Sequence, residues 1–330
     1  MSNIDFLSIG DATTDAFIDL KNAHVWNDGG AQKLCVNFGD KIEYESVDMV
    51  HGVGNAPNAA ISASRLGLQT ALSTNIGSDT NGKEALKIWQ SDSVDTTEVR
   101  THSEFATHFH FVLRHGAERT ILIKHEKWPY VLPSLPTPPK WIYLTSLGKH
   151  SEEYHHRIAE YCTANNVKLA FQPGTFQINF SAEGKLKDIY EATEIFFCNK
   201  EEAQRILGEA SNNILELLPK MIEYGPNIAV ITDGPRGAYA SDGKRTYHMP
   251  MYPDPAPAVD RTGAGDAFAS TVTAMLASGM SLQDALERGP INSMNVVQHI
   301  GAQAGLLTRG RLEELLRIAP DSYKLEKLNL

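Results

Sequence analysis

A glycine-rich segment late in the sequence combines two features that phosphoryl chemistry needs. Residues 259–270 read Val-Asp-Arg-Thr-Gly-Ala-Gly-Asp-Ala-Phe-Ala-Ser. Gly263 and Gly265 allow positive φ, and the free N–H groups of a helix that begins here would attract an anion. Asp266 would lie beside that anion, where a carboxylate is unfavourable unless it takes a proton from an attacking hydroxyl. The alternative is an ordinary loop in which Asp266 caps the helix.

Composition limits the classes of partner. The chain has 330 residues, 42% of them hydrophobic and 21% charged, which is enough for one large α/β domain. A formal net charge of −10 argues against nucleic acid or an anionic membrane as the main partner. The three cysteines are far apart, and no apolar run approaches the roughly 20 residues of a membrane span. We therefore expect a cytoplasmic protein with reduced thiols.

The order of apolar segments predicts the elements that would position Asp266. Segments with strand character alternate with helical segments, which predicts a parallel sheet covered by helices on both faces; the strand segments are residues 6–9, 141–147, 167–171, 195–198 and 228–232. Residues 17–50 and 108–124 interrupt this order with short strands, and a hairpin turn is expected at residues 115–118. These two segments predict a small β lid.

Two glycine-containing turns are similar to nucleotide-binding motifs, but each lacks a required residue. Residues 52–54 read Gly-Val-Gly before a helix, as in a dinucleotide-binding turn, but Pro57 replaces the third glycine. Residues 77–84 nearly match a P-loop, but Glu84 replaces the Ser or Thr that binds Mg²⁺. We therefore expect neither motif to act in this way.

Histidines alternate with phenylalanines in the strand that precedes the hairpin turn. His108 and His110 have no third or fourth metal ligand at the usual spacing. We expect these side chains to face solvent or substrate.

Residues 260–268 resemble the C-terminal signature D-T-x-G-A-G-D-x-F of the ribokinase-like (PfkB) carbohydrate kinase family. The resemblance extends over about residues 4–315 and implies a three-layer α/β/α fold with a mostly parallel central sheet and a small β lid. It implies one domain over residues 1–330, with lid segments inserted at about 17–50 and 100–125. It also implies an ATP- and Mg²⁺-dependent kinase that transfers the γ-phosphoryl group to a primary hydroxyl of a sugar. Asp266 would be the catalytic base, and the amides of Gly263, Ala264, Gly265 and Asp266 would form an anion hole.

Other motifs of the family occur in its order and imply further roles. The residues implied to contact the sugar are Asp15, Gly54, Asn55 and Asn58. The residues implied to lie near the nucleotide are Asn199, Thr232, Gly234, Gly237 and Asn295. Glu202 is implied to order Mg²⁺ through water, and Asp260 and Thr262 to hold a monovalent cation such as K⁺. Asn199 and Glu202 are also explained, without any function, by an N-cap followed by an acidic first turn.

The motifs leave the acceptor open. Asn55 occupies a position that is often Lys in ribokinases. Since its neighbours are neutral, we expect an uncharged acceptor unless basic residues of the lid converge on the pocket: Arg114, Arg119 and Lys124. A nucleoside kinase shares every motif, and a non-catalytic sugar-binding regulator would have no need of Asp266. An isolated small sheet leaves an exposed face, so a homodimer through the lid is expected.

Overall fold

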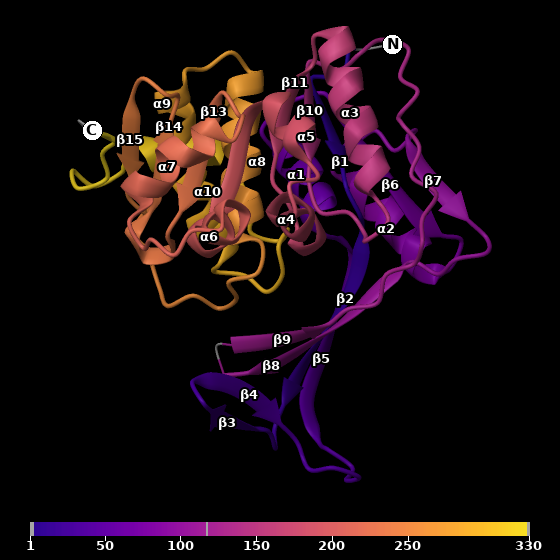
Figure 1. The fold of residues 1–330 in the computed structure, drawn as a ribbon. Coiled ribbons are helices and arrows are strands. Elements are labelled where there is room, and N and C mark those ends of the chain that lie inside the picture. Colours follow the sequence, from indigo (N-terminus) through magenta and orange to yellow (C-terminus); the bar gives the residue numbers. More distant parts are fainter. Residues whose placement is uncertain (1–2, 117, 329–330) are drawn as a thin grey trace.

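The computed structural model describes residues 3–116 and 118–328, and within them a ten-stranded sheet forms the centre of the molecule (Figure 1). Its strands, in spatial order, are β16 (Glu326–Leu328), β15 (Thr246–Met249), β14 (Ala238–Ser241), β13 (Ile228–Thr232), β12 (Thr193–Asn199), β11 (Lys168–Phe171), β10 (Trp141–Leu144), β1 (Phe6–Ile9), β6 (Thr70–Gly77) and β7 (Val99–His102). The strands from β13 to β7 are parallel, and β14, β15 and β16 are antiparallel. The expected mostly parallel sheet is confirmed.

Helices cover both faces of this sheet because its strands alternate apolar side chains between two cores. In β10, Ile142 and Leu144 face one core, whereas Trp141 and Tyr143 face the other. The first core packs against α3 (Glu152–Asn165), α4 (Thr175–Ala182), α5 (Lys187–Glu191), α6 (Lys200–Leu207) and α7 (Ile214–Glu223). The second face packs against α1 (Asn55–Arg65), α2 (Thr80–Ser91), α8 (Ala264–Ala277), α9 (Leu282–Leu286), α10 (Gly289–Val296) and α11 (Arg309–Arg317). In the described part of the chain, no helix is long and apolar enough to cross a bilayer.

A second sheet extends from the carboxyl edge of the first and forms the β lid (Figure 1). Its strand order is β5 (Tyr44–Val53), β2 (Thr13–Leu20), β8 (His108–His115) and β9 (Glu118–Leu122). A separate hairpin, β3 (His24–Asp28) with β4 (Ala31–Cys35), lies between β2 and β5 in the chain. The lid is therefore built from two excursions of the chain, one before α1 and one after β7.

The boundaries of the lid differ from those expected. The first excursion is longer than 17–50, because β2 begins at Thr13 and β5 ends at Val53. The expected start of the second, at about residue 100, is wrong because Val99–His102 pairs with β6 and covers what would otherwise be an open edge of the main sheet. The expected turn at 115–118 connects β8 to β9, although its residue 117 lies outside the described residues.

Candidate active site

A cavity of about 520 Å³ lies between the lid and the carboxyl edge of the main sheet. This is the edge at which open α/β sheets bind their ligands. The lid supplies side chains from β2, β8 and β9, and the main domain supplies the ends of β12 and β13 and the first turn of α8. Of the residues implied by the sequence, those lining the cavity are Asp15, Gly54, Asn55, Asn58, Asn199, Glu202, Thr232, Thr262, Gly263, Gly265 and Asp266.

The Asp266 carboxylate is buried and is held by three amide groups. Asn55 Nδ2 donates to Oδ1 at 2.7 Å, and Gln172 Nε2 donates to the same oxygen at 3.2 Å. Asn58 Nδ2 donates to Oδ2 at 2.8 Å. Burial raises the pKa of Asp266, and the three donors only partly oppose this effect. The side chain makes no cap hydrogen bond, because Gly263 is the N-cap of α8, so the capping alternative is wrong.

Further hydrogen bonds orient these amides toward Asp266. The buried Tyr143 hydroxyl donates to Gln172 Oε1, which turns the amide nitrogen of Gln172 toward the carboxylate. Gln303 Nε2 donates to Asn58 Oδ1 at 3.0 Å, which does the same for Asn58. The sequence reasoning missed Tyr143, Gln172 and Gln303. The available signal for Gln172 was its place directly after the buried strand β11, at the carboxyl edge of the sheet.

The turn before α8 leaves its amides free. Gly263 has φ 82°, a left-handed conformation, and a Cβ there would lie 2.3 Å from Ala302 Cβ. In the described part of the chain, none of the amides of residues 263–266 donates a hydrogen bond; the first to do so is Ala267, which donates to the Gly263 carbonyl. The unused donors and the positive end of the helix dipole favour an anion next to Asp266.

The end of β12 and the start of α6 bring a partly buried carboxylate to the cavity. Asn199 and Glu202 form a reciprocal capping box at the start of α6, with each backbone N–H donating to the other's side chain at 2.8 Å. The same two residues line the cavity, so they both cap α6 and are placed to contact a ligand. Burial is the largest effect on Glu202 and raises its pKa. Thr232, at the end of β13, lines the same region.

Five of the residues implied by the sequence do not line the cavity: Ala264, Gly234, Gly237, Asn295 and Asp260. Asn295 donates its amide to the Gly305 carbonyl at 2.7 Å, so this side chain is engaged within the fold. Gly237 has φ 85° and passes close to the Met249 carbonyl, which explains the glycine by backbone packing. Both oxygens of Asp260 accept hydrogen bonds, one from Thr262 and the other from Gly301 N.

The lid contributes a carboxylate and several basic groups to the cavity. Asp15 lies opposite His110, with Oδ1 and Nδ1 separated by 3.4 Å. Arg119 also lines the cavity. The other two basic lid residues named above do not converge on it: Arg114 is paired with Asp19, and Lys124 with Glu126.

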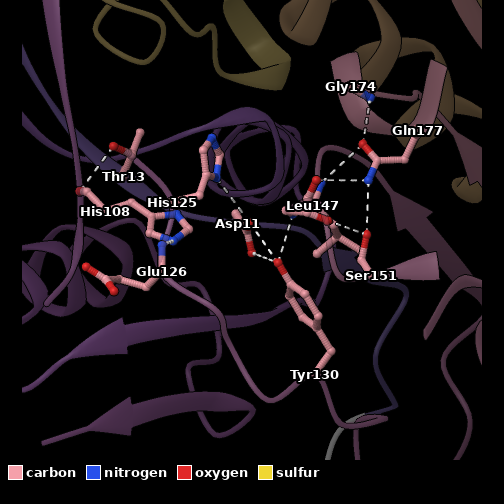
Figure 2. A network of polar contacts seen from close by, with 11 residues as sticks. Asp11, Thr13, His108, His125, Glu126, Tyr130, Leu147, Ser151, Gly174 and Gln177 are labelled. Atoms are coloured by element: carbon pink, nitrogen blue, oxygen red, sulfur yellow. Dashed lines mark hydrogen bonds and ion pairs between the residues drawn. The ribbon is translucent and has the colours of Figure 1, made fainter. Parts of the chain in front are cut away.

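His108 lies in a buried cluster at the base of the lid. Asp11, His108 and His125 each place one potential ligand atom within 4.8 Å of the others, so the structure supplies metal-ligand types that the sequence spacing did not reveal. However, His108 Nε2 accepts the Glu126 N–H at 2.9 Å, and burial lowers the pKa of His108 to about 4 (Figure 2). A neutral imidazole has one nitrogen lone pair. Since this hydrogen bond uses it, His108 cannot ligate a metal without breaking the bond.

Comparison with known proteins agrees with this geometry. The family model described as pfkB family carbohydrate kinase matches residues 18–309. The chain is 29% identical to the ribokinase of Bacillus subtilis, over 80% of this chain and 87% of that protein. It is 24% identical to the ATP-dependent 6-phosphofructokinase of Thermoanaerobacterium thermosaccharolyticum, over 82% and 85%. The nucleoside kinase structure from Methanocaldococcus jannaschii has the same fold, with a TM-score of 0.79 at 17% identity, covering 96% of this chain and 99% of that one. The chain therefore belongs to the pfkB family of carbohydrate kinases and has the fold of the ribokinase-like structures.

Proposed function

We propose that this protein transfers the γ-phosphoryl group of ATP to a primary hydroxyl of a sugar, with Asp266 as the general base. The observation that carries the proposal is the position of Asp266 at the start of α8. A buried carboxylate with a raised pKa lines the same cavity as a turn whose amides are unused. A base with a pKa moved toward the working pH is more effective in proton transfer, and free amides can hold the transferring phosphoryl group.

The hydrogen bonds of Asp266 indicate which oxygen takes the proton. Each carboxylate oxygen can accept about two hydrogen bonds. Oδ1 already accepts from Asn55 and Gln172, whereas Oδ2 accepts only from Asn58. The acceptor hydroxyl would therefore donate to Oδ2. Asp15, across the cavity, would hold other hydroxyls of the sugar, and the lid would exclude water from the reaction.

The residues present fit a hard divalent cation with the nucleotide. Glu202 Oε2 is used by the capping box, and Glu202 lines the cavity with a pKa raised by burial. Mg²⁺ prefers oxygen ligands and keeps several waters, so Glu202 would hold it through water. When bound, the ion would offset negative charge on the phosphates. The amides of residues 263–266 and the carboxylate of Asp266 perform the protein's own part of the chemistry.

Release of ADP from Mg²⁺-ATP, measured across pentoses, hexoses, sugar phosphates and nucleosides, tests this function. We expect turnover to require a sugar acceptor with a primary hydroxyl. A clear preference for nucleosides would instead support a nucleoside kinase. If neither a sugar nor a nucleoside were phosphorylated, the result would support the non-catalytic sugar-binding regulator. The monovalent cation expected at Asp260 and Thr262 stays a prediction, tested in the same assay by replacing KCl with tetramethylammonium chloride.

The outer face of the lid supports a homodimer. Residues paired across a sheet share a face, and Ala16 of β2 pairs with both Met49 and Phe111, while Phe111 pairs with Leu122. Met49, Phe111 and Leu122 are 46%, 44% and 52% exposed. The cavity-lining Asp15 and Phe17 alternate with Ala16, so this apolar row points away from the cavity. A second copy of the lid would cover it.

Replacing Phe111 with glutamate should convert the dimer into a monomer. The buried partner face would then receive a charge that it cannot solvate or pair. Sedimentation velocity of Phe111→Glu should show half the parent mass. Ile318→Glu places the same charge on a 62% exposed apolar residue of the main domain and should leave the mass unchanged. A monomeric parent protein would contradict the proposed dimer.

A further inference from the structure

A second cavity, of about 280 Å³, adjoins the first at the base of the lid. Its walls come from the segment after β9 and from the residues between β10 and α3. Three residues line both cavities: Ile123, His125 and Phe176. One ligand that passes these side chains could therefore extend from the first cavity into the second.

The second cavity is basic. It is lined by Lys127, Lys149, His150 and His125, and its one carboxylate, Glu126, is paired with Lys124 at 2.9 Å. In the described part of the chain, neither Lys127 nor Lys149 forms an ion pair. The first cavity contains both signs of charge, with the carboxylates of Asp15, Glu202 and Asp266 and the guanidinium groups of Arg119 and Arg261. An anionic end of the acceptor would therefore be attracted to the second cavity, while the free amides at the start of α8 remain available to the phosphates of the nucleotide.

The walls of this cavity are fixed and contain an unused hydrogen-bond donor. The Tyr130 hydroxyl accepts the Gly148 N–H at 2.8 Å and donates to Asp11, which anchors both wall segments to the main domain (Figure 2). Burial and the neighbouring Asp11 raise the pKa of Tyr130, so it remains a donor at neutral pH. Trp128 is 4% exposed, and its Nε1 is buried without a hydrogen-bond partner in the described part of the chain, whereas His125 Nδ1 lies 3.9 Å from Asp11 Oδ2. The Trp128 N–H is therefore an unused donor of a residue that lines this cavity.

We infer that the acceptor carries a carboxylate or phosphate at the end remote from the transferred hydroxyl, and that the second cavity binds this group. The inference rests on the proposed kinase function and deepens it by naming the substrate class. It revises the expectation of an uncharged acceptor, which considered the residues around Asn55 and the basic residues of the lid but not Lys127 and Lys149. The neutral part of the sugar lies near Asn55 and Asn58, and the anionic end lies near Lys127 and Lys149.

Matched pairs of acceptors test the inference. The pairs are glucose with gluconate, for a carboxylate, and fructose with fructose 6-phosphate, for a phosphate. We expect the parent enzyme to have a higher kcat/KM for the anionic member of at least one pair. The variant Lys127→Met/Lys149→Met keeps the aliphatic length but removes both charges, and should lower that value about tenfold or more, the size expected for losing hydrogen bonds to a charged group. Its kcat/KM for the neutral member should stay within about twofold.

A control variant separates the site from the overall charge. Lys83→Met/Lys324→Met removes two charges from exposed residues that line neither cavity and should behave like the parent. A parent preference for the neutral members, or an equal loss for both members in the double variant, would overturn the inference.

Binding measured without ATP distinguishes failure of the inference from failure of the kinase function. Calorimetry with gluconate and with fructose 6-phosphate should show binding to the parent and loss of binding in Lys127→Met/Lys149→Met. This result would support the anionic site even if no acceptor were phosphorylated. Absence of binding for both ligands would overturn it.

Discussion

Asp266→Asn should lower kcat by roughly 10²–10⁴ while the protein remains folded. Asparagine preserves the volume of the side chain but cannot accept the hydroxyl proton as a carboxylate does. The parent rate should itself fall as the pH decreases through the raised pKa of Asp266, because only the ionised base is active. Steady-state ADP release with the best acceptor, measured as a function of pH, reports both effects. The residual rate of the Asn variant should not show this decrease at low pH.

The stability of the Asn variant follows from two opposing changes. At neutral pH the parent bears the cost of burying an ionised carboxylate whose pKa is raised, and the variant does not. The amide oxygen of the new asparagine can replace Oδ1 and accept from Asn55 and Gln172. Its NH₂ group then replaces Oδ2 and faces the NH₂ group of Asn58, so two donors meet. Asn58 is held in orientation by Gln303, so one donor loses its acceptor, at a cost of about 1–3 kcal/mol. The melting temperature should therefore change by only a few degrees.

Asp79→Asn is the matched control for this variant. Asp79 caps α2, accepts from Gly82 N at 2.8 Å and lies outside the cavity. Its substitution should leave kcat within a few-fold of the parent value. If Asp266→Asn shows the same behaviour, the proposed base is wrong.

Gly263→Ala should damage both stability and catalysis. The left-handed backbone costs an L-residue about 1–2 kcal/mol, and the new Cβ would collide with Ala302, which adds about 1–3 kcal/mol of overpacking. Relief of this collision would move the amides of residues 263–266, and loss of one such donor typically lowers kcat by about 10²–10³-fold. Denaturant unfolding and ADP release measure the two effects.

Gly265→Ala provides the comparison for stability. A Cβ at Gly265 would meet only Gln172 Nε2, at 3.8 Å, and the residue lies within the first turn of α8. The free energy of unfolding should therefore be close to that of the parent, even if the methyl group hinders the ligand. Equal stabilities for Gly263→Ala and Gly265→Ala would contradict the strained turn described above.

The sequence was sufficient for the fold and for the centre of the candidate site because those signals are local. The turn that starts at Gly263 is predicted from its own glycines, and the strands are predicted from continuous apolar runs such as residues 228–232. The partners of Asp266 were harder to predict. Gln172 and Tyr143 come from neighbouring strands, and nothing in their own segments shows that they meet α8.

Two further features depend on contacts that exist only in the folded chain. Asn295 has the residue type expected near a nucleotide, yet its amide satisfies the carbonyl of Gly305, a backbone contact with no sequence signature. The second cavity brings Lys127 and His150 together from two loops that are separated by β10. Neither loop contains a motif, so charge in this cavity could be recognised only after the chain was folded.

The place of β1 inside the main sheet, between β10 and β6, also affects how the chain can acquire its structure. Among the strands of this sheet β1 comes earliest in the sequence, and its neighbours are residues 70–73 of β6 and 141–144 of β10. One edge of β1 therefore stays unpaired until residues 141–144 have left the ribosome. Such long-range pairing slows folding and exposes strand edges to aggregation. Fragments that end before residue 141 would retain this open edge, so expression of the intact chain is the sound basis for every measurement proposed above.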